Sequence, residues 1–174
     1  MPTSALVTVD EYLHTTYEPD MEYVDGQLVE RHVGEYFHSR MQALIVALLA
    51  GRERERRFRV FSEQRVRVSS EPRFRIPDVC VKALPHPVTP ILEQPDLVIE
   101  ILSPDDRPGG MLERISDYQQ AGIAHIWIVD PYEKRVFEAD RFGIQKAAQL
   151  VLEADPVGVV DFQPLFAELD EPAE

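Results

Sequence analysis

Two acidic residues stand in segments that are otherwise typical of short, buried β-strands. Asp78 lies in segment 75–81 and Glu100 in segment 95–102, and both segments are rich in valine, isoleucine and leucine. An ionised carboxylate in such a strand is costly unless it is paired, hydrogen-bonded or bound to a metal. The fold must therefore give each carboxylate a partner. Two carboxylates placed in such buried segments indicate a metal site.

The spacing of residues within the two segments indicates how the carboxylates can meet. Side chains two residues apart in a strand share a face, which places Asp78 with Cys80 and Glu100 with Val98. If the strands are neighbours, the carboxylates converge, and such a pair suits Mg²⁺ or Mn²⁺ completed by water and a substrate phosphate. The alternative for each carboxylate is a structural salt bridge or a helix cap.

The order of predicted elements indicates an α/β fold. Apolar residues at 3.6-residue spacing predict a helix over 35–57, and alternation predicts a strand over 58–68 with a candidate break at 62–64. After the two carboxylate strands, a helix is expected from near Met111 to Gly122, then strands over 125–130 and 135–139. An Asp25-Gly26 step predicts a hairpin over 21–30. The expected fold is a mixed sheet flanked by helices, with an N-terminal hairpin.

The length and composition indicate one domain. The 174 residues are 44% hydrophobic and 28% charged, with no apolar run long enough to span a membrane and no signal-peptide pattern. We expect a core over about 8–140, a C-terminal edge strand and acidic tail over 141–174, and a cytoplasmic location. Cys80 is expected to be a small buried hydrophobe, and the histidines show no zinc-binding spacing.

Charge is unevenly distributed along the chain. The net charge of −13 argues against general polyanion binding, yet residues 52–75 carry nine arginines against four acidic residues. This run has two interpretations. The arginine run could bind a phosphate backbone, or it could be a solvated helix end stabilised by i,i+4 ion pairs.

A set of ordered motifs from Thr8 to Phe137 resembles the Uma-type putative restriction endonuclease family, within the PD-(D/E)xK nuclease superfamily. The superfamily core has the order helix, three strands, helix, strand, which is the order that the residue pattern predicts independently. The motifs that carry the resemblance are Glu22 in segment 21–28, His38, Pro77-Asp78, segment 95–104, Tyr118 with 121–123, and segment 127–131.

The resemblance implies a restriction-endonuclease-like fold, a nucleic-acid substrate that we expect to be DNA, and a homodimer. It makes Asp78 and Glu100 the ligands of Mg²⁺ or Mn²⁺, with Glu22 and His38 as candidate additional members of the site. The superfamily lysine position holds Leu102, and the position where many family members carry lysine holds Arg114. Arginine stays charged, so it can stabilise an anion but cannot act as a general base.

Several of these residues also have a structural interpretation. Arg114 either stabilises charge on the phosphate or pairs with Asp117 on the same helix. His38 is a core histidine or lies near the metal, and Glu22 is either exposed or functional. Gln64 is a turn residue or lines the site, and Arg75 contacts phosphate or solvent. Asp105 and Asp106 are expected to cap the second helix.

Three functional hypotheses follow from the sequence. The first is a divalent-metal-dependent endonuclease with Asp78, Glu100, Arg114 and Glu22 as catalytic residues. The second is a catalytically silent nuclease-fold protein that binds DNA or a protein partner as a regulator. The third is a structural domain in which the two strand carboxylates are salt-bridged to Arg75 and Arg114.

Overall fold

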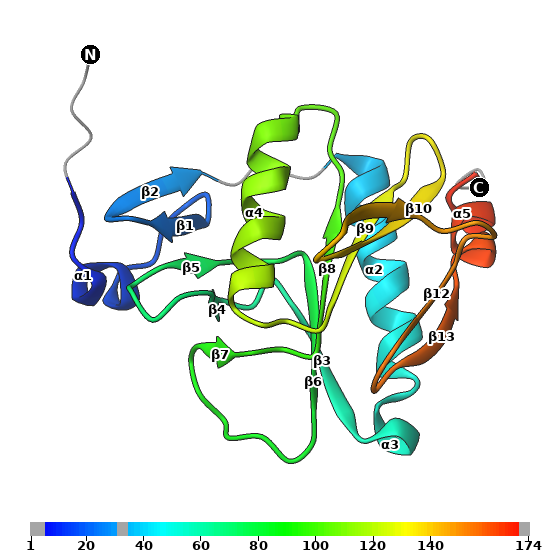
Figure 1. Ribbon diagram of the computed structural model, residues 1–174, viewed down its shortest axis with the longest axis horizontal. Coiled ribbons are helices and arrows are strands. Elements are labelled where there is room, and N and C mark those ends of the chain that lie inside the picture. Colours follow the sequence, from blue (N-terminus) through cyan, green and yellow to red (C-terminus); the bar gives the residue numbers. More distant parts are fainter. Residues whose placement is uncertain (1–5, 31–34, 171–174) are drawn as a thin grey trace.

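The computed structural model describes residues 6–30 and 35–170, which form two sheets, a small hairpin and five helices (Figure 1). The central feature is a six-stranded mixed sheet. In spatial order its strands are β11 (Gly143–Lys146), β10 (Arg135–Asp140), β9 (His125–Asp130), β8 (Leu97–Ile101), β6 (Val79–Ala83) and β3 (Phe58–Ser62). Strand β8 is parallel to β9 and antiparallel to β6.

Helices cover both faces of this sheet. Helix α2 (Tyr36–Ala50) packs Met41, Ile45 and Leu49 against one face, and α4 (Pro108–Gln120) packs Met111 and Ile115 against the other. The order α2, β3, β6, β8, α4, β9 confirms the predicted helix, three strands, helix, strand arrangement. Each strand of the sheet centre is buried on both faces, which explains its nearly continuous apolar sequence.

A second sheet of five short strands lies beside the first, in the order β2 (Gln27–Glu30), β1 (Met21–Val24), β5 (Phe74–Arg75), β4 (Val66–Arg67) and β7 (Leu92–Glu93). Its β1–β2 hairpin is the predicted one, and both turn residues, Asp25 and Gly26, have positive φ. Helix α1 (Val9–His14) covers this sheet through Tyr12, which packs with Tyr23 and Phe74.

The predicted strand over 58–68 is two strands in different sheets. Strand β3 ends at Ser62, Glu63 adopts a positive φ of 52°, and the chain then enters the second sheet as β4. The predicted helix over 35–57 also differs, because α2 ends at Ala50 and a separate turn of helix, α3 (Glu53–Arg56), follows Gly51.

The C-terminal part was expected to be an edge strand followed by an acidic tail. Strand β11 is an edge strand of the central sheet, but the described residues that follow it are folded. Strands β12 (Val151–Ala154) and β13 (Gly158–Asp161) form a hairpin, and α5 (Gln163–Leu169) follows it. Phe162, Phe166 and Leu169 are buried against the α2 face of the central sheet. This segment completes the core because the α2 layer alone does not cover that face.

Candidate active site

Asp78 and Glu100 converge because their strands are antiparallel neighbours. Val79 lies opposite Ile99, so the next pair along the same ladder is Asp78 and Glu100. Both residues are nearly inaccessible to solvent, with 4% and 3% of their surface exposed. The structure therefore brings the two predicted metal ligands together at one end of the central strands.

Asp78 is held from two directions. The backbone N–H of Ile101 donates to its Oδ2 at 2.7 Å, and Nε2 of His38 lies 3.3 Å from the same oxygen. Gln42, one helical turn beyond His38 on α2, donates from Nε2 to the backbone carbonyl of Asp78 at 2.9 Å. Helix α2 thus places His38 beside the carboxylate and fixes the strand end that carries it.

Glu100 is held by two side chains of α4. The Tyr118 hydroxyl donates to Oε1 at 2.5 Å, and Nε of Arg114 lies 3.7 Å from Oε2. Burial raises the pKa of Glu100 to about 7; the charge of Arg114 opposes this rise and the charge of Asp78 adds to it. The charge of Asp78 thus adds to the cost of ionising Glu100, which a bound cation would lower.

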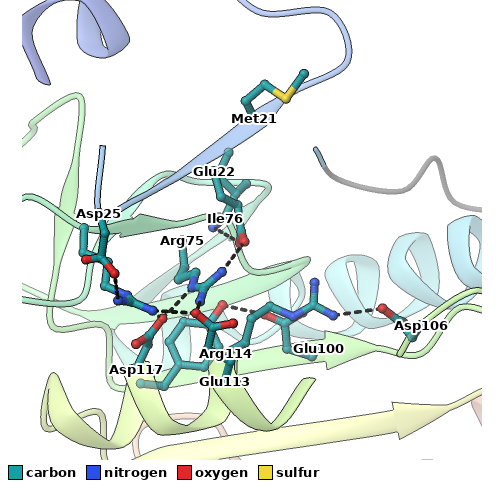
Figure 2. Close-up of polar contacts among 12 residues, drawn as sticks. Met21, Glu22, Asp25, Arg75, Ile76, Glu100, Asp106, Glu113, Arg114 and Asp117 are labelled. Atoms are coloured by element: carbon teal, nitrogen blue, oxygen red, sulfur yellow. Dashed lines mark hydrogen bonds and ion pairs between the residues drawn. The ribbon is translucent and has the colours of Figure 1, made fainter. Parts of the chain in front are cut away.

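Arg114 bridges the carboxylates and the loop that precedes α4. Its Nη2 donates to Asp106 at 2.9 Å, while its Nε is buried without a hydrogen-bond partner among the described residues (Figure 2). The charge of Glu100 raises the pKa of Arg114 above its usual value, so the guanidinium remains charged. Of the two alternatives for Arg114, the pairing with Asp117 is not seen, because Asp117 accepts hydrogen bonds from Arg73 and Arg75 instead.

Asp106 has a different role from the predicted helix cap. Helix α4 begins at Pro108, three residues before the predicted start, and its N-cap residue Arg107 makes no side-chain capping bond. Asp106 instead accepts from the backbone N–H of Ser103 at 2.7 Å and from Arg114. It therefore orients Arg114 toward Glu100.

Glu22 and Arg75 form a buried ion-pair network next to these residues. Arg75 donates from Nη1 to Glu22 at 2.7 Å and from Nε to Asp117 at 2.6 Å (Figure 2). The second oxygen of Glu22 accepts from the backbone N–H of Ile76 at 3.0 Å, two residues before Asp78. Glu22 and Arg75 connect the hairpin, the Asp78 segment and α4, but neither lines the cavity between the carboxylates.

Gln64 also lies outside that cavity. Its Nε2 donates to the backbone carbonyls of Arg65 and Pro90, which ties the strand break to a proline-rich loop at residues 85–90. The cavity of about 20 Å³ is lined by His38, Asp78, Glu100, Ile101, Ser103, Asp106 and Arg114. Its size suits about one water molecule or a small cation.

The roles of Tyr118 and Asp106 beside Glu100 and Arg114 were not predicted. Tyr118 was named only among the motifs of the family resemblance, and its position one turn after Arg114 on the same helix face is the signal that would have indicated a shared partner. Asp106 gave no such signal because its contact depends on the path of the loop. Cys80 is buried as predicted, and burial raises the pKa of its thiol to about 12.

The chemistry of the donor set fits a hard divalent cation. Two carboxylates supply oxygen ligands, the preferred ligands of Mg²⁺ and Mn²⁺. Within residues 6–30 and 35–170, no three His, Cys, Asp or Glu side chains are grouped so as to hold a metal ion by themselves. Water and a substrate phosphate would have to complete the coordination, as is common for Mg²⁺.

The third functional hypothesis, a purely structural ion-pair arrangement, matches these contacts only in part, because Arg114 pairs with Glu100 but Arg75 does not pair with Asp78. Asp78 lies beside His38 rather than Arg75, and Arg75 is bound to Glu22 and Asp117.

Within the part of the chain that the structure describes, there is no helix long and apolar enough to cross a membrane.

Comparison with known proteins supports the resemblance seen in the motifs. The structure is similar to the crystal structure at 1.96 Å of a putative nuclease belonging to DUF820 from Anabaena variabilis ATCC 29413, with a TM-score of 0.80 and 24% identity over 94% of this chain and 99% of that one. This likeness confirms the fold. No curated protein matches the chain. The family model described as Uma2, putative restriction endonuclease, matches residues 9–151, which is most of the sequence, and the chain therefore belongs to the Uma2 family.

Proposed function

We propose that this protein is a divalent-metal-dependent endonuclease that hydrolyses nucleic-acid phosphodiester bonds, with DNA as the expected substrate. The observation that carries the proposal is the convergence of Asp78, Glu100 and Arg114 around one small cavity. The family match to putative restriction endonucleases supports the same reaction class. The proposal gives each of these residues a separate role.

Asp78 and Glu100 are the proposed ligands of Mg²⁺ or Mn²⁺, which when bound would polarise a phosphoryl oxygen and acidify water. Arg114 supplies a fixed positive charge beside Glu100, which can stabilise negative charge on a phosphate bound in the cavity. Tyr118 orients Glu100, and His38 contacts Asp78. Glu22 and Arg75 act as positioning residues through the segment that carries Asp78.

The presence of Arg114 at a position where many family members carry lysine favours a second candidate function. The described residues that line the cavity contain no lysine, and Arg114, at the position where many family members carry lysine, stays charged and cannot take a proton from water. A catalytically silent protein that binds nucleic acid or a protein partner would keep the fold and the metal site without turnover.

A cleavage assay separates the two functions. Plasmid and single-stranded DNA are incubated at low salt with Mn²⁺, Mg²⁺ or EDTA, using the wild-type protein, Asp78→Asn and Glu153→Gln prepared identically. Glu153 is exposed on β12, so Glu153→Gln is a matched control for removing one carboxylate charge. We expect metal-dependent cleavage that is lost in Asp78→Asn and kept in Glu153→Gln. Equal activity in all three, or none in any, would instead support the silent binding protein.

We further propose that the protein is a homodimer. Strand β11 is an edge strand of the central sheet, its four residues are exposed, and Ile144 within it has 44% of its surface accessible. An unpaired edge with an apolar side chain is a surface on which a second copy can add strands. Light scattering should give the mass of a dimer, and a monomeric mass at all concentrations would contradict this proposal.

A further inference from the structure

Part of the arginine run is not accounted for by the candidate active site or by ion pairs. Arg52 donates to the carbonyls of Val157 and Val159, and Arg59 contacts Glu53, while Arg73 and Arg75 belong to the network around Asp117. Two others, Arg65 and Arg67, line a separate cleft. The run is therefore neither one continuous basic surface nor simply a solvated helix end.

This cleft has a volume of about 640 Å³, within the range of small-molecule sites. It lies between α1, the strands β4 and β7 and the proline-rich loop, and Figure 1 shows these elements to one side of the central sheet. Its lining combines the basic side chains of Arg65, Arg67 and Lys82 with apolar groups that include Ile91 and Leu92. Such a lining fits a ligand with an anionic group and an apolar or planar body.

The positive charge of the cleft is incompletely neutralised. Among the described residues, neither Arg65 nor Lys82 forms an ion pair, and Arg67 meets the exposed Glu93 at 3.5 Å. The Lys82 ammonium donates to the backbone carbonyl of Gln94, which is uncharged and leaves other N–H groups of the ammonium available. On a chain with a net charge of −13, this concentration of incompletely neutralised cations is a local feature that attracts anions.

Two buried nitrogen atoms of the lining have no hydrogen-bond partner among the described residues. They are Nε of Arg65 and Nε2 of His86. Nδ1 of His86 bonds to the Pro87 carbonyl at 2.9 Å, and since a carbonyl only accepts, Nδ1 carries the proton. Buried polar atoms are usually satisfied, so these two indicate groups that a ligand in the cleft would bond.

The walls of the cleft are held in place by bonds within the fold. The guanidinium of Arg65 lies 4.3 Å from the centroid of the Tyr12 ring, and Gln64 ties the proline-rich loop to β4 through the Pro90 carbonyl. Strand β7 pairs with β4 in parallel, with Val66 opposite Leu92. The cationic groups are therefore positioned before a ligand arrives, which reduces the entropy cost of binding.

The cleft is separate from the cavity between the carboxylates. The two sets of lining residues have no member in common. Lys82 lies four residues beyond Asp78 along β6, a separation of about 13 Å in an extended strand. A ligand of the cleft would therefore bind without contacting Asp78 or Glu100.

We propose that this cleft binds a phosphate ester of nucleotide size, with the phosphate held by Arg65, Arg67 and Lys82 and the apolar wall covering the rest of the ligand. The phosphate ester could belong to a free nucleotide or to a nucleic-acid chain. The volume of the cleft favours the free nucleotide. The inference does not depend on nuclease activity.

Binding to the full chain is measured by isothermal titration with four probes: adenosine 5′-monophosphate, adenosine, inorganic phosphate and a short oligothymidylate. We expect saturable binding of the monophosphate, at least about tenfold weaker binding of adenosine, and displacement of the monophosphate by inorganic phosphate. Lys82→Gln and Arg67→Gln should each weaken monophosphate binding by about tenfold. Both side chains are partly exposed, so the variants are expected to fold.

Two control variants locate the binding site. Arg141→Gln removes one exposed arginine charge outside the cleft and should leave the affinity unchanged, as should Asp78→Asn. No saturation by the monophosphate, or equal weakening in Arg141→Gln and Lys82→Gln, would overturn the proposal. Loss of binding in Asp78→Asn would place the ligand at the carboxylates instead. If the oligothymidylate binds and Lys82→Gln weakens that binding, while the monophosphate does not bind, the assignment to a free nucleotide is overturned.

Discussion

Tyr118 donates a hydrogen bond of 2.5 Å to Glu100 from one helical turn beyond Arg114, whose Nε lies 3.7 Å from the other oxygen of the same carboxylate. One face of α4 therefore fixes both oxygens of Glu100. A carboxylate held in this way is oriented before any cation or substrate arrives, and outer contacts of this kind are known to tune metal affinity.

Tyr118→Phe removes this hydrogen bond without changing the packing of the ring. We expect Mn²⁺ affinity to fall by about tenfold because Glu100 is no longer held in position. The free energy of unfolding should fall by about 2 kcal/mol, the usual size for a hydrogen bond to a charged group. Calorimetric Mn²⁺ titration and urea unfolding measure the two effects. Tyr36→Phe, at an exposed tyrosine, is the control, and equal Mn²⁺ affinities in the two variants would contradict the role of Tyr118.

Asp78→Asn and Glu100→Gln test the proposed metal ligands directly. Each variant should lose binding of Mn²⁺ and Mg²⁺ because one of the two carboxylates is gone. The fold should survive or become more stable, since charge repulsion between the two groups is removed. Mn²⁺ binding followed by electron paramagnetic resonance, together with thermal unfolding, checks both expectations. Unfolding of both variants would show that the carboxylates are structural.

Arg114→Lys tests the consequence of the lysine replacement. A lysine at this position can lose its proton in a buried site and so assist in activating water, which arginine cannot do. We expect any rate of DNA cleavage to rise, measured as turnover on plasmid with saturating Mn²⁺. An unchanged or lower rate would mean that the contacts of Arg114 with Asp106 and Glu100 have a role that lysine does not replace.

Arg75→Met leaves Glu22 and Asp117 buried without their shared cation. Removing one partner of a buried ion pair typically costs about 3–5 kcal/mol, and Arg75 is only 3% exposed. Urea unfolding of Arg75→Met should show a loss of this size. Arg135→Met, at an exposed pair with Glu133, should cost less than about 1 kcal/mol. Similar losses in the two variants would show that the buried network contributes little to stability.

The raised pKa of Tyr12 should lower the free energy of unfolding at alkaline pH. Burial raises the pKa of its hydroxyl from 10.0 to about 12, so the folded state holds a proton that the unfolded state releases between pH 10 and 12. The contribution of Tyr12 to the free energy of unfolding should therefore be constant below pH 10 and fall through this range. Tyr12→Phe should lose less stability than wild type between pH 10 and 12 in urea unfolding, although it also loses the hydrogen bond to the Met21 carbonyl. Identical losses would contradict the assignment to Tyr12.

Features with regular spacing were predictable from the sequence. Residues two apart in a strand were predicted to lie on one face of the sheet, as for Asp78 with Cys80 and for Val98 with Glu100. The two carboxylates can then meet only if their strands are neighbours, and β6 and β8 are neighbours. Gly122 correctly marked the end of α4, where it adopts a positive φ of 74°. These features depend on local backbone geometry, which the sequence carries directly.

Features that depend on distant contacts were not predictable in this way. Strands β5 and β7 have two residues each, too few to show a period. Arg75 binds Glu22 and Asp117, which lie 53 and 42 residues away, so nothing near Arg75 in the sequence indicates that it is buried. The break between β3 and β4 was expected, but the separation of the two strands into different sheets depends on how the sheets pack.

The hairpin β12–β13 and helix α5 have a consequence for how the chain acquires its structure during synthesis. Leu152, Val160, Phe162, Phe166 and Leu169 share one apolar cluster with α2, which is made more than a hundred residues earlier. A nascent chain that has reached only residue 150 would leave this face of α2 open to water and to other chains. Closure of that layer must therefore wait until the segment around Leu169 has left the ribosome.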